Sequence, residues 1–162
     1  LIKSQQTHRK IYLYDTYEGM PEPTDKDIDI HGEPYRLLWK KEKEFLSVSL
    51  DEVKKNIFST GYPKENIIFV KGMVQDTIPN TVPKQIALLR LDTDLYESTY
   101  HELFHLYPKT TSQGVIIIDD YGHFQGSQEA TEKYLSQNPQ KVLLHRIDYS
   151  CRVWIKPSPT QK

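Results

Sequence analysis

The amino-acid sequence predicts an α/β fold whose sheet is mostly parallel and ends in a C-terminal antiparallel hairpin. Short apolar runs typical of buried strands occur at residues 66–72, 85–92 and 114–119, and segments with a helical spacing of apolar residues separate them. Strands that alternate with helices form a mostly parallel sheet covered on both faces. The last two strand-like runs, residues 141–149 and 151–157, are close enough in sequence to pair as an antiparallel hairpin.

The first strand is expected at residues 10–15, where an apolar and aromatic run ends in an aspartate and is followed by Gly19 and prolines. Residues 24–48 are polar with scattered aromatic side chains, and we interpret them as an insertion or a lid. Ser49 and Glu52 have the spacing of a capping box, which predicts that a helix begins there.

Two further helices are expected after the central strands. In the first, which Pro108 should end, Tyr96, Tyr100 and Phe104 lie on one side at helical spacing, and Leu103 and Leu106 widen that apolar face. The second is expected at residues 126–137. Each helix follows a strand, as the alternating pattern of an α/β fold requires.

Composition and charge exclude several classes of protein. Of the 162 residues, 27% are charged and 37% are hydrophobic, which is typical of a globular domain. The formal net charge of −1 implies no general attraction to nucleic acid or to an anionic membrane, and no long apolar run predicts a membrane span. The only cysteine, Cys151, excludes an internal disulfide and is typical of a reducing compartment, so we expect a cytoplasmic protein.

The start of the chain bears on its domain organisation. The sequence begins at Leu1 rather than at methionine, and its first residues read as the end of a preceding segment. We therefore expect residues 1–162 to form a single, N-terminally truncated domain.

Three predicted strands end in an acidic residue, namely Asp15, Asp92 and Asp119. Ligands of open parallel sheets bind outside the carboxyl ends of the strands, so these three residues should face one crevice. Asp94 and Asp120 lie close to them in sequence. Carboxylate oxygens are the ligands that Mg²⁺ prefers, and a bound cation would lower the pKa of a hydroxyl group beside it.

Each acid also has a simpler interpretation. A strand-end aspartate can cap the following helix, and this is our expectation for Asp94. The adjacent carboxylates of Asp119 and Asp120 would repel each other if buried, unless a cation or a proton separates them, so we interpret that pair as a metal site. Asp15 could accept hydrogen bonds from both hydroxyls of a ribose or could start the turn before Gly19, and spacing alone does not decide between them.

Gly72 and three histidines are weaker candidates for binding. Gly72 follows a predicted strand and would let the backbone approach a flat ligand closely, although the segment after it could be only a turn. His101 and His105 satisfy the bare HExxH spacing of a zinc site, but no third ligand is evident in the sequence and zinc is not expected there. His123 follows the acidic pair and could reach a substrate or a metal.

Four motifs occur in a distinctive order: IYLYDTYEGMPEP, VKGMVQDTIP, LLRLDTDLYEST and GVIIIDDYG. In this order and spacing they resemble the macrocin O-methyltransferase family, a branch of the S-adenosylmethionine-dependent methyltransferases with a Rossmann-like fold. The closing HRIDYSCRVWIKP resembles the terminal antiparallel hairpin of that family. The resemblance covers roughly residues 9–157, which is nearly the whole chain.

The resemblance implies roles for particular residues. The aspartate of the first motif would bind the cofactor ribose, here Asp15 with Thr16 beside it, and the loop after the next strand would frame the adenine with Gly72, Met73, Val74 and Gln75. A Mg²⁺-like ion would be held by Asp92, Asp119 and Asp120, and Asp92 would also accept the proton of the substrate hydroxyl. Catechol O-methyltransferases instead use a lysine three residues after this aspartate, and that position here is Leu95.

Two departures from the family pattern affect these expectations. Family members carry a glycine-rich strand-to-helix turn before the ribose-binding aspartate, and residues 1–9 contain no glycine. We therefore expect the Rossmann-like methyltransferase sheet to lack its first strand, which would leave the cofactor pocket incomplete. In the helix after the acidic pair, Gln128 stands where the family has an arginine, so substrate preference could differ.

The sequence therefore predicts an O-methyltransferase that uses S-adenosylmethionine and a divalent cation and acts on a hydroxyl of a sugar or small secondary metabolite. Nucleic acid and membranes are not expected as partners, and a homo-oligomer is compatible with the sequence. Two alternatives remain. A nucleotide-sugar glycosyltransferase would use LDTDL as its DxD metal motif but leaves Asp15, Asp119 and Asp120 unexplained, and a degenerate, non-catalytic fragment would bind no cofactor.

Overall fold

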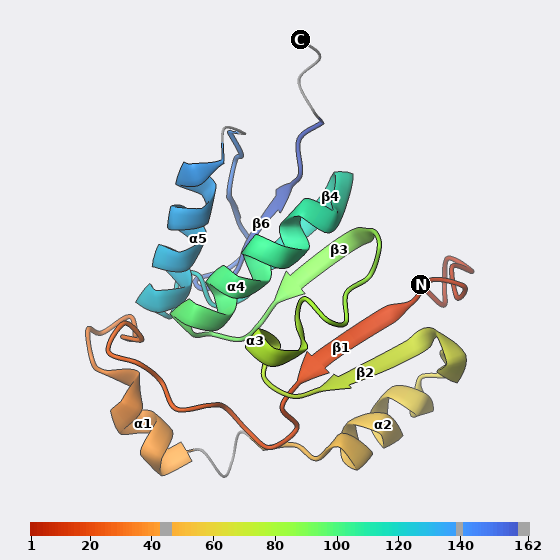
Figure 1. Ribbon diagram of the computed structural model, residues 1–162, viewed down its shortest axis with the longest axis horizontal. Coiled ribbons are helices and arrows are strands. Elements are labelled where there is room, and N and C mark those ends of the chain that lie inside the picture. The colour runs from red at the N-terminus through yellow and green to blue at the C-terminus, as the bar shows by residue number, and fades with distance from the viewer. Residues whose placement is uncertain (43–46, 139–140, 159–162) are drawn as a thin grey trace. The chain divides into compact units, whose positions relative to one another are not determined.

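The computed structural model describes residues 1–42, 47–138 and 141–158, and Figure 1 labels its elements. The chain divides into two compact units, the first made of Leu1–Pro21 and Lys41–Thr81, the second of Glu22–Lys40 and Val82–Lys162. Each unit contains its own sheet. Residues 43–46 of the predicted lid lie outside the described residues, and the lid stays a prediction.

The first unit is built on two parallel strands. Its elements are β1 (Ile11–Asp15), α2 (Leu50–Ser59), the short 3-10 helix η1 (Lys64–Asn66), β2 (Ile67–Lys71) and α3 (Val74–Thr77). β1 and β2 pair in parallel, in a register that ends with Asp15 opposite Lys71. Helix α2 begins as the sequence predicts, because the Ser49 side chain accepts a hydrogen bond from the backbone N–H of Glu52 at 3.3 Å.

The second unit contains a mixed four-stranded sheet. The elements are most of α1 (Tyr35–Glu42), then β3 (Ile86–Leu91), α4 (Tyr96–Leu106), η2 (Tyr107–Lys109), β4 (Thr110–Ile118), α5 (Gln125–Gln137), β5 (His145–Arg146) and β6 (Arg152–Ile155). The strand order is β3-β4-β6-β5, with β3 parallel to β4 and with β6 antiparallel to both β4 and β5. Parallel strands followed by a C-terminal antiparallel hairpin confirm the predicted fold class.

One face of this four-stranded sheet carries the core of the second unit. Leu89 is paired with Ile116, and Ile116 with Trp154, so these side chains share a face. All three are buried. Tyr107 contacts Trp154 and also Tyr134 of α5, with ring centroids 6.3 and 5.4 Å apart. The helices that follow β3 and β4 are therefore fixed against this face of the sheet through contacts near their C-terminal ends.

Helix α4 buries most of the predicted apolar face. Tyr96, Leu103 and Leu106 are buried, as expected. Phe104 was predicted on the same face but is 57% exposed. The buried side also includes a carboxyl group, that of Glu102, which the spacing of apolar residues did not predict.

Residues 22–40 are hydrogen-bonded to the first turns of α4 and α5. Asp27 is only 1% exposed, and its Oδ1 accepts the backbone N–H of Tyr96 at 2.8 Å. The carbonyl oxygen of Ile28 accepts the backbone N–H of Gln125, also at 2.8 Å. Because the first N–H groups of a helix have no partner within the helix, this segment caps both helices from a distance in sequence.

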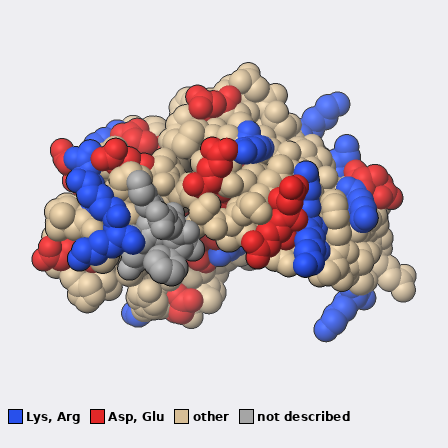
Figure 2. All heavy atoms as spheres, turned by 90° about the horizontal axis from the view of Figure 1, so that it is seen from below, with Lys and Arg blue, Asp and Glu red and all other residues tan. Residues whose placement is uncertain are grey.

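Charged side chains of both signs are interspersed on the face that Figure 2 shows, and neither sign covers a broad area there. This distribution fits the formal net charge of −1. In the described part of the chain, helices are too short and too polar to cross a membrane: α5 has 13 residues, and a span needs about 20 apolar ones.

Replacing Asp27 should destabilise the second unit. Its Oδ2 also accepts the backbone N–H and the hydroxyl of Thr24, at 2.7 and 2.8 Å, so Asp27→Ala leaves several donors unpaired. We expect the free energy of unfolding to fall by about 2–4 kcal/mol, measured by urea denaturation. Asp25→Ala is the matched control, because Asp25 is exposed two residues away. Equal stability of the two variants would contradict the capping role.

Candidate active site

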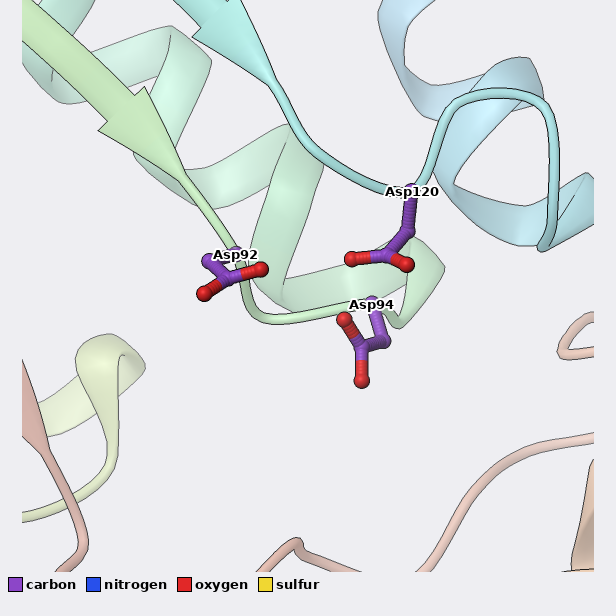
Figure 3. Close-up of side chains that lie close together, drawn as sticks. All are labelled: Asp92, Asp94 and Asp120. Atoms are coloured by element: carbon purple, nitrogen blue, oxygen red, sulfur yellow. The ribbon is translucent and has the colours of Figure 1, made fainter. Parts of the chain in front are cut away.

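Asp92, Asp94 and Asp120 form an acidic group in the second unit (Figure 3). Each offers one carboxylate oxygen, and these three oxygens lie within 4.8 Å of one another. Asp92 and Asp94 follow β3 and Asp120 follows β4, and the parallel pairing of these strands brings their carboxyl ends to the same edge of the sheet. The structure thus places together two of the three residues that the sequence predicts as metal ligands.

Asp94 joins this group, although the sequence predicts it as a helix cap. That prediction is wrong, because the N-cap of α4 is Leu95, and the backbone N–H of Tyr96 bonds to Asp27 instead. Asp94 has a left-handed backbone conformation with φ of 62°, which aspartate tolerates better than most residues. The sequence feature that could have indicated this placement is that Asp92 and Asp94 are separated by a single residue in the turn after β3.

Asp119, the third predicted ligand, lies beside Arg90 and outside the group of three. The Arg90 guanidinium contacts Asp119 Oδ1 at 3.0 Å and also donates a hydrogen bond to Asp92. Arg90 lies two residues before Asp92, so both side chains leave the chain on the same side. Arg90 was not predicted from the sequence as part of the site. Its position two residues before Asp92 could have indicated that the two side chains lie close together.

The acids raise one another's pKa values. Burial raises the pKa of Asp94 to about 9, and a hydrogen bond with Asp120 and the charges of Asp120, Asp92 and Asp119 add to the effect. Burial and the neighbouring Asp92 also raise the pKa of Asp119, while Arg90 opposes this rise. Because one arginine faces several carboxyl groups, a proton or a cation is needed to relieve their repulsion.

The geometry of the group suits a hard divalent cation. Two ligand oxygens at about 2.1 Å from Mg²⁺ lie at most about 4.2 Å apart. The observed limit of 4.8 Å is only slightly larger, so small side-chain rotations would close Asp92, Asp94 and Asp120 around the ion. Carboxylate oxygens are also the ligand type that Mg²⁺ and Ca²⁺ prefer over nitrogen or sulfur.

The predicted cofactor residues lie together in the first unit. The carbonyl oxygen of Asp15 accepts the backbone N–H of Gly72 at 3.0 Å, so the ends of β1 and β2 bring both predicted loops side by side. Asp15 is exposed, and its Oδ1 accepts the backbone N–H of Tyr17 at 2.6 Å, as in a turn that starts at an aspartate. The Thr16 hydroxyl donates to the carbonyl oxygen of Gly19 at 2.6 Å.

The second of these loops has a backbone that requires glycine. Gly72 has φ of 137°, and an added Cβ would approach the Thr77 side chain to 3.0 Å. Met73 follows in extended conformation as the N-cap of α3, and Val74, the first residue of that helix, is buried. Gln75 is exposed. The loop therefore presents backbone atoms and Gln75 outward while Val74 anchors it.

The histidines take no part in the acidic group. His101 and His105 lie on α4 with ring centroids 4.4 Å apart. In the part of the chain that the structure describes, the group of three potential metal ligands is the aspartate group, and the histidines are not among its members. His123 Nδ1 lies 3.4 Å from the hydroxyl of Tyr149, in the hairpin turn.

The fold is that of O-methyltransferases of known structure. The O-methyltransferase NovP superposes with a TM-score of 0.81 at 28% identity, over 93% of this chain and 61% of NovP. The calicheamicin methyltransferase CalS11 superposes with a TM-score of 0.66 at 19% identity, over 94% of this chain and 62% of CalS11. The second likeness shows the fold alone. The likeness to NovP places the chain among α/β methyltransferases.

The chain belongs to the macrocin O-methyltransferase (TylF) family, whose model matches residues 1–156. This is a family of S-adenosylmethionine-dependent O-methyltransferases, as the sequence predicts, and it does not support the glycosyltransferase alternative.

Curated relatives agree with this assignment. A Streptomyces olivaceus enzyme, 8-demethyl-8-(2,3-dimethoxy-alpha-L-rhamnosyl)-tetracenomycin-C 4'-O-methyltransferase, is 35% identical over 91% of this chain and 55% of its own length. Demethyldecarbamoylnovobiocin O-methyltransferase of Streptomyces niveus is 32% identical over 78% of this chain and 47% of its own. The chain thus spans about half the length of the curated relatives it matches.

The pKa of Asp94 predicts how the stability of the metal-free protein depends on pH. A carboxyl group whose pKa rises on folding from 3.8 to about 9 favours the folded state fully only below the lower value, and this contribution is lost as the pH rises toward 9. We therefore expect stability to fall between pH 5 and about pH 8 in EDTA. Asp94→Asn, which stays neutral, should be more stable than wild type at pH 8 by about 1–2 kcal/mol.

Urea denaturation at both pH values measures this effect, and a given concentration of added Mg²⁺ should stabilise the wild type more than Asp94→Asn. Asp25→Asn serves as the control for removing one exposed carboxylate. The same pH dependence in Asp94→Asn and in wild type would contradict the account of repulsion within the acidic group.

Proposed function

We propose that the protein is an S-adenosylmethionine-dependent O-methyltransferase that methylates a hydroxyl of a sugar or small secondary metabolite, assisted by a divalent cation. The observation that carries this proposal is the convergence of Asp92, Asp94 and Asp120 at the ends of β3 and β4, in a chain of this family. The sugar substrate class is supported by the Streptomyces olivaceus relative, whose name specifies a rhamnosyl compound.

The acidic group has two tasks in the proposed reaction. Asp94 and Asp120 would hold the cation together with Asp92, and the cation when bound would lower the pKa of the acceptor hydroxyl. Asp92 would accept the hydroxyl proton as the acceptor oxygen attacks the methyl carbon, while the carbon–sulfur bond breaks and S-adenosylhomocysteine leaves. Asp119, predicted from the sequence as a ligand, would act with Arg90 to fix the orientation of Asp92.

Asp94 is a second candidate for the proton acceptor. It belongs to the same group and is more buried than Asp92. A base must be judged by the loss of turnover when it is replaced, whereas a pure metal ligand is judged by the loss of metal affinity. The two aspartates are thus distinguishable by experiment.

The cofactor would bind to the residues that lie together in the first unit. We propose that the exposed carboxylate of Asp15, beside Thr16, accepts hydrogen bonds from the ribose hydroxyls. The loop formed by Gly72, Met73, Val74 and Gln75 would frame the adenine, because the glycine lets the backbone approach a flat ring closely. The turn bond from Tyr17 supports this role, since it holds the Asp15 carboxylate in one orientation.

Replacing Asp15 should weaken cofactor binding. Asp15→Ala removes hydrogen bonds to a charged acceptor, so we expect the Kd of S-adenosylmethionine to rise about 10- to 100-fold in isothermal titration calorimetry. Asp15→Asn keeps an oxygen for the turn and should bind better than Asp15→Ala. Glu18→Ala is the control, because Glu18 lies in the same turn and pairs with Lys71 at 2.6 Å.

Unchanged affinity in Asp15→Ala would contradict the ribose role. No binding of S-adenosylmethionine by the wild type would favour the non-catalytic alternative, and binding of UDP-glucose instead would favour the glycosyltransferase.

Turnover separates the roles of the two aspartates that follow β3. With Mg²⁺ and demethyldecarbamoylnovobiocin, the compound in the name of the Streptomyces niveus relative, as the test acceptor, Asp92→Asn should lower kcat about 100-fold or more. Asp94→Asn should chiefly raise the Mg²⁺ concentration needed for half-maximal rate. Formation of S-adenosylhomocysteine is the readout, and Asp25→Asn is the control. If instead Asp94→Asn abolishes turnover at saturating Mg²⁺ and Asp92→Asn does not, the base is Asp94.

A further inference from the structure

We infer that the hydrogen-bonded pair Thr93–Glu102 is a positioning device that holds Asp92 and Asp94 in the orientation needed to bind the cation. This inference rests on the metal-assisted reaction proposed above and concerns residues that the reaction itself does not use. Thr93 is the single residue between the two aspartates, and Glu102 lies on α4 behind that turn.

Glu102 is an unusual residue for its location. It is 5% exposed, and its Oε2 accepts a hydrogen bond from the Thr93 hydroxyl at 2.8 Å. The pKa of Glu102 is raised to about 8, chiefly by burial, and the bond from Thr93 opposes this rise while the charge of Asp92 adds to it. A buried carboxyl group destabilises the fold unless it is well hydrogen-bonded, so its presence here needs a reason.

The backbone of Thr93 is held as firmly as its side chain. Its carbonyl oxygen accepts the backbone N–H of Leu95 at 2.6 Å, and the buried Ser98 hydroxyl lies 3.2 Å from the same oxygen. Ser98 and Glu102 are one helical turn apart on α4, so residues on one face of the helix contact both the backbone and the side chain of Thr93. These hydrogen bonds restrain the turn at Thr93.

Two features of the turn favour its leaving the geometry needed to bind a cation, so hydrogen bonds from the surrounding structure are needed to hold it. Asp94 has a left-handed backbone, a conformation that persists only where the surroundings enforce it. The carboxylates of Asp92, Asp94 and Asp120 also repel one another without a cation, which favours their moving apart. A metal site requires its ligands to be held within about 0.5 Å of the binding geometry, and outer hydrogen bonds supply this restraint.

The chain offers a closely matched pair of variants. Thr93→Val keeps the shape of the side chain but removes the donor to Glu102, whereas Thr93→Ser keeps the donor. Binding of Mn²⁺, followed by electron paramagnetic resonance of the free ion, reports on the site without cofactor or acceptor. We expect Thr93→Val to raise the Kd of Mn²⁺ about tenfold or more, and Thr93→Ser to stay within about twofold of wild type.

Glu102 provides the second half of a double-mutant cycle. Glu102→Leu should weaken Mn²⁺ binding as much as Thr93→Val does, and the double variant should show no further loss, because both changes remove one interaction. Glu102→Gln retains an acceptor oxygen and should restore most of the affinity. Urea denaturation in EDTA shows whether each variant is folded, so that a loss of affinity is not mistaken for a loss of structure.

The outcomes separate this inference from the proposed function. If wild type binds Mn²⁺ and Thr93→Val binds it equally well, the positioning role is wrong while metal assistance stands. Equal losses in Thr93→Val and Thr93→Ser would also overturn it, since the hydroxyl would then be irrelevant. A wild type that binds no Mn²⁺ would overturn metal assistance and this inference together.

Discussion

The parallel pairing of β3 with β4 is the constraint on which the candidate site depends. The register joins Leu91 to Ile118, and the backbone N–H of Asp119 bonds to the carbonyl oxygen of Leu91 at 3.0 Å. The two strands therefore end at the same edge of the sheet, and each is followed by a turn that begins with an aspartate. Buried apolar side chains on one face of the sheet fix this register, because a shift by one residue would expose them.

Carboxylates that converge at one edge of the sheet repel one another, and neighbouring positive charge compensates for this repulsion only in part. Arg90 pairs with Asp92 of the acidic group and with Asp119, which lies outside it. The more buried Asp94 carries a strongly raised pKa, chiefly because it is buried, and the charges of the neighbouring acids add to this rise. Perturbed pKa values of this kind cluster at functional sites.

Sequence reasoning found the strands and the edge at which they end, because apolar runs and the acids that follow them are local features. It did not find which acids face one another. Adjacent acids after β4 take different places, since Asp119 contacts Arg90 whereas Asp120 joins the acidic group, and the turn after the strand decides this. The capping of α4 by Asp27 could not be predicted from local sequence patterns either, because 69 positions separate Asp27 from Tyr96.

Anomalous diffraction from crystals grown with Mn²⁺ tests the central claim most directly. The account predicts one strong peak with carboxylate oxygens of Asp92, Asp94 and Asp120 at about 2.1–2.3 Å and with Asp119 still paired to Arg90. A peak bound by Asp119 in place of Asp94, or an ion elsewhere with the three aspartates turned apart, would contradict it.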